Sequence, residues 1–166
     1  MIRPAKPADA AAICAIYNYY IENSSHTFEE KAVTQEEMEG RIIKIGERYT
    51  YLVSVDGSGE INGYAYVNTW KERSSYRFTV ELSIFVSESC RGKGIGSELM
   101  EKLLGEIRKT DIHTVISGIV LPNDGSVALH EKFGFKKAGH FFEAGKKFGK
   151  WHDVGYWELI IRNTHG

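Results

Sequence analysis

The chain has 166 residues, of which 42% are hydrophobic and 26% charged, proportions typical of a folded globular protein. Its 21 Lys and Arg residues nearly balance 22 Asp and Glu residues, which excludes the global positive field expected of a nucleic-acid-binding protein. No run approaches the ~20 apolar residues that span a bilayer, and neither cysteines nor histidines have metal-ligand spacing. We therefore expect a single domain, residues 1–166, in the cytoplasm with reduced cysteines, and no nucleic acid, membrane or metal as partner.

The first half of the chain predicts a strand, two helices and a hairpin, at residues 2–5, 7–22, 34–45, and 49–55 with 60–70. Pro7 favours the start of the first helix, whose apolar positions recur at helical spacing. Thr34 and Glu37 have the spacing of a capping box, in which each side chain accepts a hydrogen bond from the other's backbone N–H. The turn residues 56–59 separate the two strands of the hairpin.

The second half predicts a strand, a helix, a strand, a short helix and two last strands, at residues 78–86, 99–107, 115–120, 123–133, 135–144 and 154–161. Asn123 is a favourable N-cap and Gly134 a favourable C-terminal residue for the short helix, and residues 145–153 read as a hairpin loop. The order βααβββαβαββ predicts one α/β (α+β) domain with a mixed, mainly antiparallel central sheet and flanking helices. In its strand, Glu81 is the one acid, on the polar face.

A glycine-rich turn, Arg91-Gly92-Lys93-Gly94-Ile95-Gly96, connects this strand to the following helix. Such a turn collects backbone N–H groups at the positive end of a helix dipole, and its two cationic side chains add charge, so it predicts an anion site. A tight turn without a ligand has the same spacing. The glycines match neither the dinucleotide fingerprint G-x-G-x-x-G nor a P-loop, which disfavours dinucleotide binding.

The pattern Arg-x-x-Gly-x-Gly at this junction resembles the acetyl-CoA pyrophosphate loop of the GNAT superfamily of N-acetyltransferases, and Asn123 and Gly134-Phe135 extend the resemblance. Within that superfamily the chain is most similar to the phosphinothricin/methionine sulfone N-acetyltransferases. The segments that carry the similarity are Ile2-Arg3-Pro4-Ala5, Ala15-Ile16-Tyr17-Asn18, Thr27-Phe28-Glu29, Gly63-Tyr64-Ala65-Tyr66, Thr79-Val80-Glu81, Leu121-Pro122-Asn123-Asp124, Leu129-His130-Glu131 and Lys150-Trp151-His152-Asp153-Val154-Gly155. They cover nearly the whole chain.

The resemblance implies the GNAT fold and acetyl-CoA as the co-substrate. The end of the central strand would pair with the amides of the pantetheine arm, and the glycine turn would hold the pyrophosphate. The implied cofactor-binding residues are Ile84, Phe85, Val86, Arg91, Gly92, Lys93, Gly94, Ile95, Gly96, Ser97 and Asn123.

The resemblance also implies two catalytic residues. Glu81 matches the acid that the family uses near the acceptor amine, as a general base acting directly or through water; the alternative is a solvated or salt-bridged strand residue. His130 occupies a position where many members of the superfamily carry a tyrosine that protonates the thiolate. It is a proton donor, a residue that holds a water, or a helix histidine bonded to backbone. Cys90 is disfavoured as a nucleophile because no Cys/His/acid arrangement accompanies it.

The acceptor pocket is expected around the loop after residue 70. The implied substrate-binding residues are Phe28, Trp70, Lys71, Arg73, Tyr76 and Glu81. The planar guanidinium of Arg73 suits a bidentate contact with an amino-acid carboxylate, although an exposed charged loop has the same composition. By family analogy Lys147 and Trp151 complete the walls, from this or a neighbouring subunit, and the family leads us to expect a homodimer.

These implications predict an enzyme that acetylates the α-amino group of a small amino acid with a tetrahedral, oxygen-bearing head, such as phosphinothricin, methionine sulfoximine or methionine sulfone, in a detoxification role. An acetyltransferase for another amine is the first alternative: a polyamine, an aminoglycoside, or a protein N-terminus or lysine. A non-catalytic acyl-CoA sensor is the second, and it would have no use for both Glu81 and Arg73.

Overall fold

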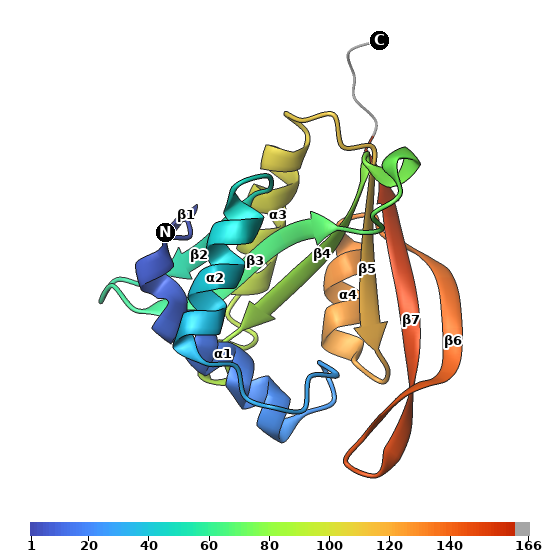
Figure 1. Ribbon diagram of the computed structural model, residues 1–166, viewed down its shortest axis with the longest axis horizontal. Helices are drawn as coiled ribbons and strands as arrows, with labels where there is room; N and C mark the ends of the chain where they lie inside the picture. Colours follow the sequence, from blue (N-terminus) through green and yellow to red (C-terminus); the bar gives the residue numbers. More distant parts are fainter. Residues whose placement is uncertain (162–166) are drawn as a thin grey trace.

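The computed structural model describes residues 1–161, and its helices and strands follow the predicted order (Figure 1). The elements are β1 (Ile2–Pro4), α1 (Ala10–Asn23), α2 (Gln35–Gly46), β2 (Tyr51–Val55), β3 (Ile61–Thr69), β4 (Thr79–Val86), α3 (Ile95–Ile107), β5 (Thr114–Val120), α4 (Asp124–Lys132), β6 (Lys136–Lys147) and β7 (Lys150–Ile160). Short 3₁₀ turns precede α1, β4 and α3, at Pro7–Asp9, Ser74–Tyr76 and Glu88–Cys90. None of the described helices is long and apolar enough to cross a membrane.

The strands form one sheet in the order β1-β2-β3-β4-β5-β7-β6, which confirms the predicted α/β class. All neighbouring strands are antiparallel except β4 and β5, which are parallel and pair only over residues 79–81 and 114–116. Beyond that point the two strands diverge (Figure 1). At the fork, the Ser117 hydroxyl donates to the Leu82 carbonyl oxygen at 3.3 Å. One edge of β4 therefore has no neighbouring strand toward its carboxyl end.

Helices cover both faces of the β1–β4 part of the sheet (Figure 1). The predicted apolar stripe of α3 packs on one face, where Leu99, Met100 and Leu103 are fully buried. Burial of each such side chain contributes about 1.5–3 kcal/mol relative to exposure. On the other face, α1 and α2 pack against the alternate residues of the same strands, such as Val53 and Tyr64. This two-sided core fixes the position of β4.

Several helix ends lie where local sequence signals predict them. Thr34 and Glu37 form the predicted capping box. The Asn123 side chain accepts a hydrogen bond from the Ser126 N–H, so α4 begins where its N-cap was expected. Gly134 ends α4 with a φ of +89°, a backbone conformation that favours glycine. These caps place the first turn of α4 beside the β4–β5 fork.

The expected hairpin loop at residues 145–153 is wrong. Strand β6 continues to Lys147 and β7 begins at Lys150, so the turn consists of Phe148 and Gly149, both with positive φ as in a type I′ turn. Gly145 indicated a loop, but it belongs to the ladder and pairs with His152. A side chain at Gly145 would meet the ring of Phe28, so close packing requires the glycine there.

Candidate active site

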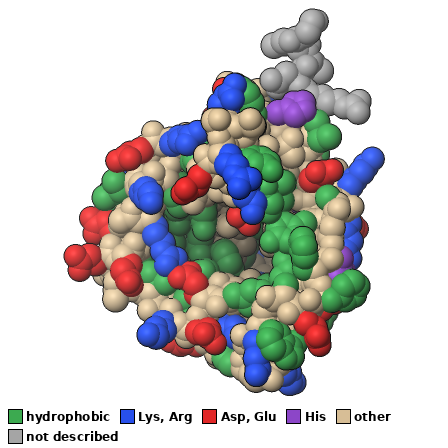
Figure 2. Space-filling model, turned by 45° about the vertical axis from the view of Figure 1, so that its right-hand side comes forward, with side chains coloured by type: hydrophobic (Ala, Val, Ile, Leu, Met, Phe, Trp, Pro, Cys, Tyr) green, Lys and Arg blue, Asp and Glu red, His purple; other side chains and the backbone are tan. Residues whose placement is uncertain are grey.

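A cavity of about 620 Å³ opens in the β4–β5 fork. Figure 2 shows a hollow with hydrophobic side chains on its walls and charged side chains at its rim. Besides β4 and β5, its walls come from α1, the segment after α1, the glycine turn and α4. The predicted site residues that line it are Ile84, Phe85, Val86, Arg91, Gly92, Gly94, Ile95, Gly96, Ser97, Asn123 and His130. The side chain of Lys93 is exposed and Lys93 does not line the cavity.

The glycine turn has a conformation that suits an anion. Gly92 and Gly94 have φ values of +75° and +84°, which a residue with a side chain adopts only with strain. Helix α3 begins directly after Gly94, so the free N–H groups of its first turn lie at the cavity wall. The Arg91 guanidinium lies 3.2 Å from the Glu88 carboxylate, at the mouth of the same cavity. This end of the cavity fits a phosphate group.

The end of β4, which has no partner strand on the β5 side, is held by α1. The Tyr20 hydroxyl donates a 2.6 Å hydrogen bond to the carbonyl oxygen of Val86. The ring of Phe85 packs against Tyr17 and Tyr20, with centroids 5.2 and 5.4 Å apart. These contacts hold the end of β4 in place, and its edge toward β5 is free because the two strands pair only over residues 79–81 and 114–116.

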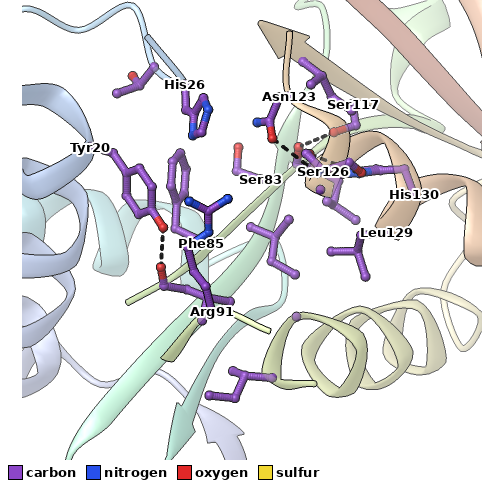
Figure 3. A pocket seen from close by; sticks show the side chains of 18 of the residues that line it. Tyr20, His26, Ser83, Phe85, Arg91, Ser117, Asn123, Ser126, Leu129 and His130 are labelled. Carbon is purple, nitrogen blue, oxygen red and sulfur yellow. Dashed lines mark hydrogen bonds between the residues drawn. The ribbon is translucent and has the colours of Figure 1, made fainter. Parts of the chain in front are cut away.

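His130 is buried in α4, with 1% of its surface exposed, and it also lines the cavity (Figure 3). Its Nδ1 lies 2.7 Å from the Ser126 carbonyl oxygen, which accepts a hydrogen bond only from a protonated Nδ1. Burial lowers the pKa of the imidazole, only partly offset by that bond, and so favours the neutral ring. Its Nε2 is then an acceptor, and it is buried without a partner among residues 1–161.

Glu81 lies beside the cavity, next to Gly118 of its wall. A methyl group on Gly118 would lie 3.7 Å from Oε1 of Glu81 and 3.1 Å from the Tyr156 ring, so both side chains stand over this glycine. Burial raises the pKa of Glu81, and the positive charge of Lys71 partly offsets that rise. Glu81 itself does not line the cavity, and the structure places its partly buried carboxyl group next to Gly118 of the cavity wall.

The predicted substrate residues of the loop after β3 fall into two groups. Trp70 packs edge-on against Tyr156 at 5.6 Å, and the Lys71 ammonium lies 5.2 Å from the centre of the Trp70 ring, so both are near Glu81. Arg73 and Tyr76 are exposed on the same loop and do not line the cavity.

Phe28 and the predicted wall residues of the β6–β7 hairpin do not line the cavity. Phe28 packs on Gly145 and tilts against His152 at 6.3 Å. The Lys147 ammonium is buried and turned toward the segment after α1, and Trp151 is 58% exposed. The chain brings neither Lys147 nor Trp151 into its own cavity.

Sequence reasoning missed several residues of the site. Tyr17, Tyr20 and His26 line the cavity from α1 and the segment after it, and Tyr156 stands over Gly118. Helical spacing alone assigns Tyr17 and Tyr20 to the apolar stripe of α1, and both do pack in the core, but the spacing gives no indication of the cavity at the end of that stripe. No local pattern marks His26 or Tyr156.

Within the described residues, neither free cysteine forms a nucleophilic arrangement with a histidine and an acid. Cys90 lines the cavity, with Sγ 3.7 Å from the Ser89 hydroxyl. Cys14 is buried and its thiol donates to the Val33 carbonyl oxygen. Within residues 1–161 there is also no group of three or more side chains suited to hold a metal ion.

Comparison with known proteins identifies the family. The model of the acetyltransferase (GNAT) domain matches residues 2–155. Over 157 residues the chain is 41% identical to phosphinothricin N-acetyltransferase of Streptomyces viridochromogenes, with 95% of this chain and 85% of that protein covered. It is 33% identical to an L-methionine sulfoximine/L-methionine sulfone acetyltransferase of Pseudomonas aeruginosa, with 98% and 95% covered.

A solved structure agrees with the sequence relatives. A phosphinothricin acetyltransferase of Sinorhizobium meliloti, crystallised with acetyl-CoA, superposes with a TM-score of 0.94 at 35% identity, covering 97% of this chain and 88% of that one. These matches confirm the predicted enzyme class, an acetyl-CoA-dependent N-acetyltransferase. The chain belongs to the GNAT family of acetyltransferases.

Proposed function

We propose that the enzyme transfers the acetyl group of acetyl-CoA to the α-amino group of a small amino acid with a tetrahedral, oxygen-bearing head. Phosphinothricin, methionine sulfoximine and methionine sulfone are the proposed acceptors, and the names of the relatives support this class. The observation that carries the proposal is one cavity whose wall includes the glycine turn and, at Gly118, lies beside the carboxyl group of Glu81.

At the donor end of the cavity, the chain binds and orients acetyl-CoA. The backbone N–H groups of the glycine turn bind phosphate oxygens, and the free edge of β4 offers main-chain groups to the amides of an extended arm. Acetyl-CoA, when bound, supplies the thioester carbonyl that an amine attacks. Holding both reactants in line can contribute about 7–11 kcal/mol to lowering the barrier.

At the acceptor end, Glu81 accepts a proton from the amine, directly or through a water. Burial supports this role because it raises the pKa of the carboxyl group and so makes the carboxylate a stronger base. Lys71 lowers the same pKa and so favours the ionised form. General-base catalysis of this kind typically contributes about 10²–10⁴ in rate.

His130 serves as a hydrogen-bond acceptor in the cavity wall. Since its Nδ1 hydrogen is engaged by Ser126, the neutral ring offers the lone pair of Nε2 and has no second proton to give. This favours the role of holding a water or a donor group of the substrate over direct protonation of the thiolate.

The carboxylate of the acceptor binds at the loop after β3. Arg73 is exposed there, and Lys71 lies beside the Trp70–Tyr156 pair. A bidentate contact with Arg73 would fix the amino acid with its amine toward Glu81. Trp70 and Tyr156 would then exclude water from the reacting groups.

We also propose a cytoplasmic homodimer with a detoxification role. The β6–β7 hairpin supports the dimer, because large aromatic side chains are exposed on it and β6 is an edge strand of the sheet. The exposed residues are Phe141, Phe142, Phe148 and Trp151.

The test is acetyl-CoA-dependent thiol release with methionine sulfoximine, in the wild type and in Glu81→Gln. We expect turnover in the wild type, a large loss in the variant, and a product whose mass spectrum places the acetyl group on the α-amine. Acetylation elsewhere on the molecule, or none, contradicts the proposal.

A further inference from the structure

His26 has a fixed position although it lies in neither a helix nor a strand. The Lys147 ammonium donates hydrogen bonds of 2.8 Å to the carbonyl oxygens of Ser24 and Thr27, on either side of His26. The His26 backbone N–H itself donates to the Ser24 hydroxyl at 3.2 Å. The segment therefore presents the His26 side chain in one place.

That place is the wall of the cavity, at its donor end. The imidazole stacks on the ring of Tyr20 at 5.9 Å, and His26 and Arg91 both line the cavity (Figure 3). No hydrogen bond joins either ring nitrogen to another residue of the described part of the chain. Both nitrogens are therefore available to a ligand near Arg91 and the glycine turn.

The charges around His26 oppose its protonation while the cavity holds no anion. Burial lowers the pKa of the imidazole most, Arg91 and Lys147 lower it further, and Glu88 alone raises it. Tyr20, the residue of α1 that the ring contacts, keeps its proton because burial raises its pKa. An anion bound near Arg91 would compensate this positive charge and favour the imidazolium.

We propose that His26 is a further phosphate ligand of the donor site and takes up a proton from solvent when a phosphate group of acetyl-CoA binds near Arg91. The inference rests on the donor site of the proposed function. Neutral imidazole plus a proton gives imidazolium, which donates a hydrogen bond to a phosphate oxygen. The affinity for acetyl-CoA then rises as the pH falls from the His26 pKa of the bound protein to that of the free protein. Outside that interval, protonation of His26 does not change the affinity.

The test is calorimetry of coenzyme A binding at pH 7 in two buffers of different ionisation enthalpy. We expect net proton uptake by the wild type that is reduced in His26→Gln and retained in His113→Gln, an exposed histidine outside the cavity. Protonation of coenzyme A itself contributes equally to the uptake measured with all three proteins. As the pH is lowered, the dissociation constant of the wild type should fall relative to that of His26→Gln. The total fall is about tenfold for each unit by which binding raises the His26 pKa.

A second arm uses 3′-dephospho-CoA to identify the phosphate. If the His26-dependent proton uptake persists with 3′-dephospho-CoA, the partner of His26 is the pyrophosphate. If that uptake is lost, the partner is the 3′-phosphate. Both results support His26 as a phosphate ligand. An NMR titration of the His26 ring protons in the wild type, with and without coenzyme A, gives the same answer should the variant fail to fold. Equal proton uptake in wild type and His26→Gln, or a His26 pKa that coenzyme A leaves unchanged, overturns the inference. Wild-type protein that binds no coenzyme A would overturn the donor site as well.

Discussion

The ammonium of Lys147, at the end of β6, lies 2.8 Å from the carbonyl oxygen of Thr27, 120 residues earlier in the chain. Lys147 is 2% exposed, and its second hydrogen bond goes to the carbonyl oxygen of Ser24. One side chain of the late hairpin thus holds the segment that carries His26 and Thr27 into the cavity wall. A residue of the β6–β7 hairpin therefore supports a segment of the cavity wall that lies early in the chain.

Lys147→Met should destabilise the protein, because it leaves the carbonyl oxygens of Ser24 and Thr27 without their donor. We expect a loss of about 1–3 kcal/mol in the free energy of unfolding, measured by urea denaturation. Lys146→Met is the matched control, since Lys146 is exposed and its ammonium lies 5.5 Å from the centre of the Trp151 ring. Equal stabilities of the two variants would contradict the anchoring role.

Glu81→Gln should lower kcat by about 10²–10⁴, since it removes the proton acceptor while preserving the shape of the side chain. The dissociation constant of acetyl-CoA should stay nearly unchanged, because the glycine turn and the end of β4 are intact. Steady-state kinetics and calorimetry separate these two effects. Turnover at the wild-type rate would remove the general-base role.

Lys71→Met should shift the acid limb of the kcat/KM pH profile to higher pH. The positive charge of Lys71 lowers the pKa of Glu81, so its removal raises that pKa, and activity is lost at a higher pH on acidification. Lys71→Arg keeps the charge and should leave the limb in place. If the limb stays where it is in Lys71→Met, Glu81 is not the group that controls it.

Arg73→Ala should raise the KM for the amino acid with a smaller effect on kcat, since in the proposed function the guanidinium binds the carboxylate in the ground state and transition state alike. Arg77→Ala is a suitable control, because Arg77 is also exposed and its guanidinium packs over Phe78. A KM that Arg73→Ala leaves unchanged would place the carboxylate elsewhere.

The order of elements and the glycine turn could be predicted from sequence because each rests on local signals. The apolar spacing of α3, the capping box at Thr34 and the N-cap Asn123 act within a few residues, and the structure confirms all three. The hairpin end could not be predicted, since Gly145 serves the packing of Phe28 from a distant segment and not a turn.

The residues of the candidate site likewise divide into those that local sequence signals predict and those that they do not. Most of the predicted donor residues follow one another along β4 and the glycine turn, and the structure brings them to one cavity. His26 and Tyr156 reach the site only through tertiary contacts, with Lys147 and Tyr20 for the first and Gly118 for the second. No spacing in the sequence encodes such contacts.

The most direct test of the proposed function compares kcat/KM for acetyl-CoA-dependent thiol release across a panel of acceptors. The panel holds phosphinothricin, methionine sulfoximine, methionine sulfone, methionine, spermidine, an aminoglycoside and a lysine peptide. We predict activity confined to the three amino acids with tetrahedral, oxygen-bearing heads. Higher kcat/KM for spermidine, the aminoglycoside or the peptide would contradict the proposed acceptor and assign the cavity to another amine.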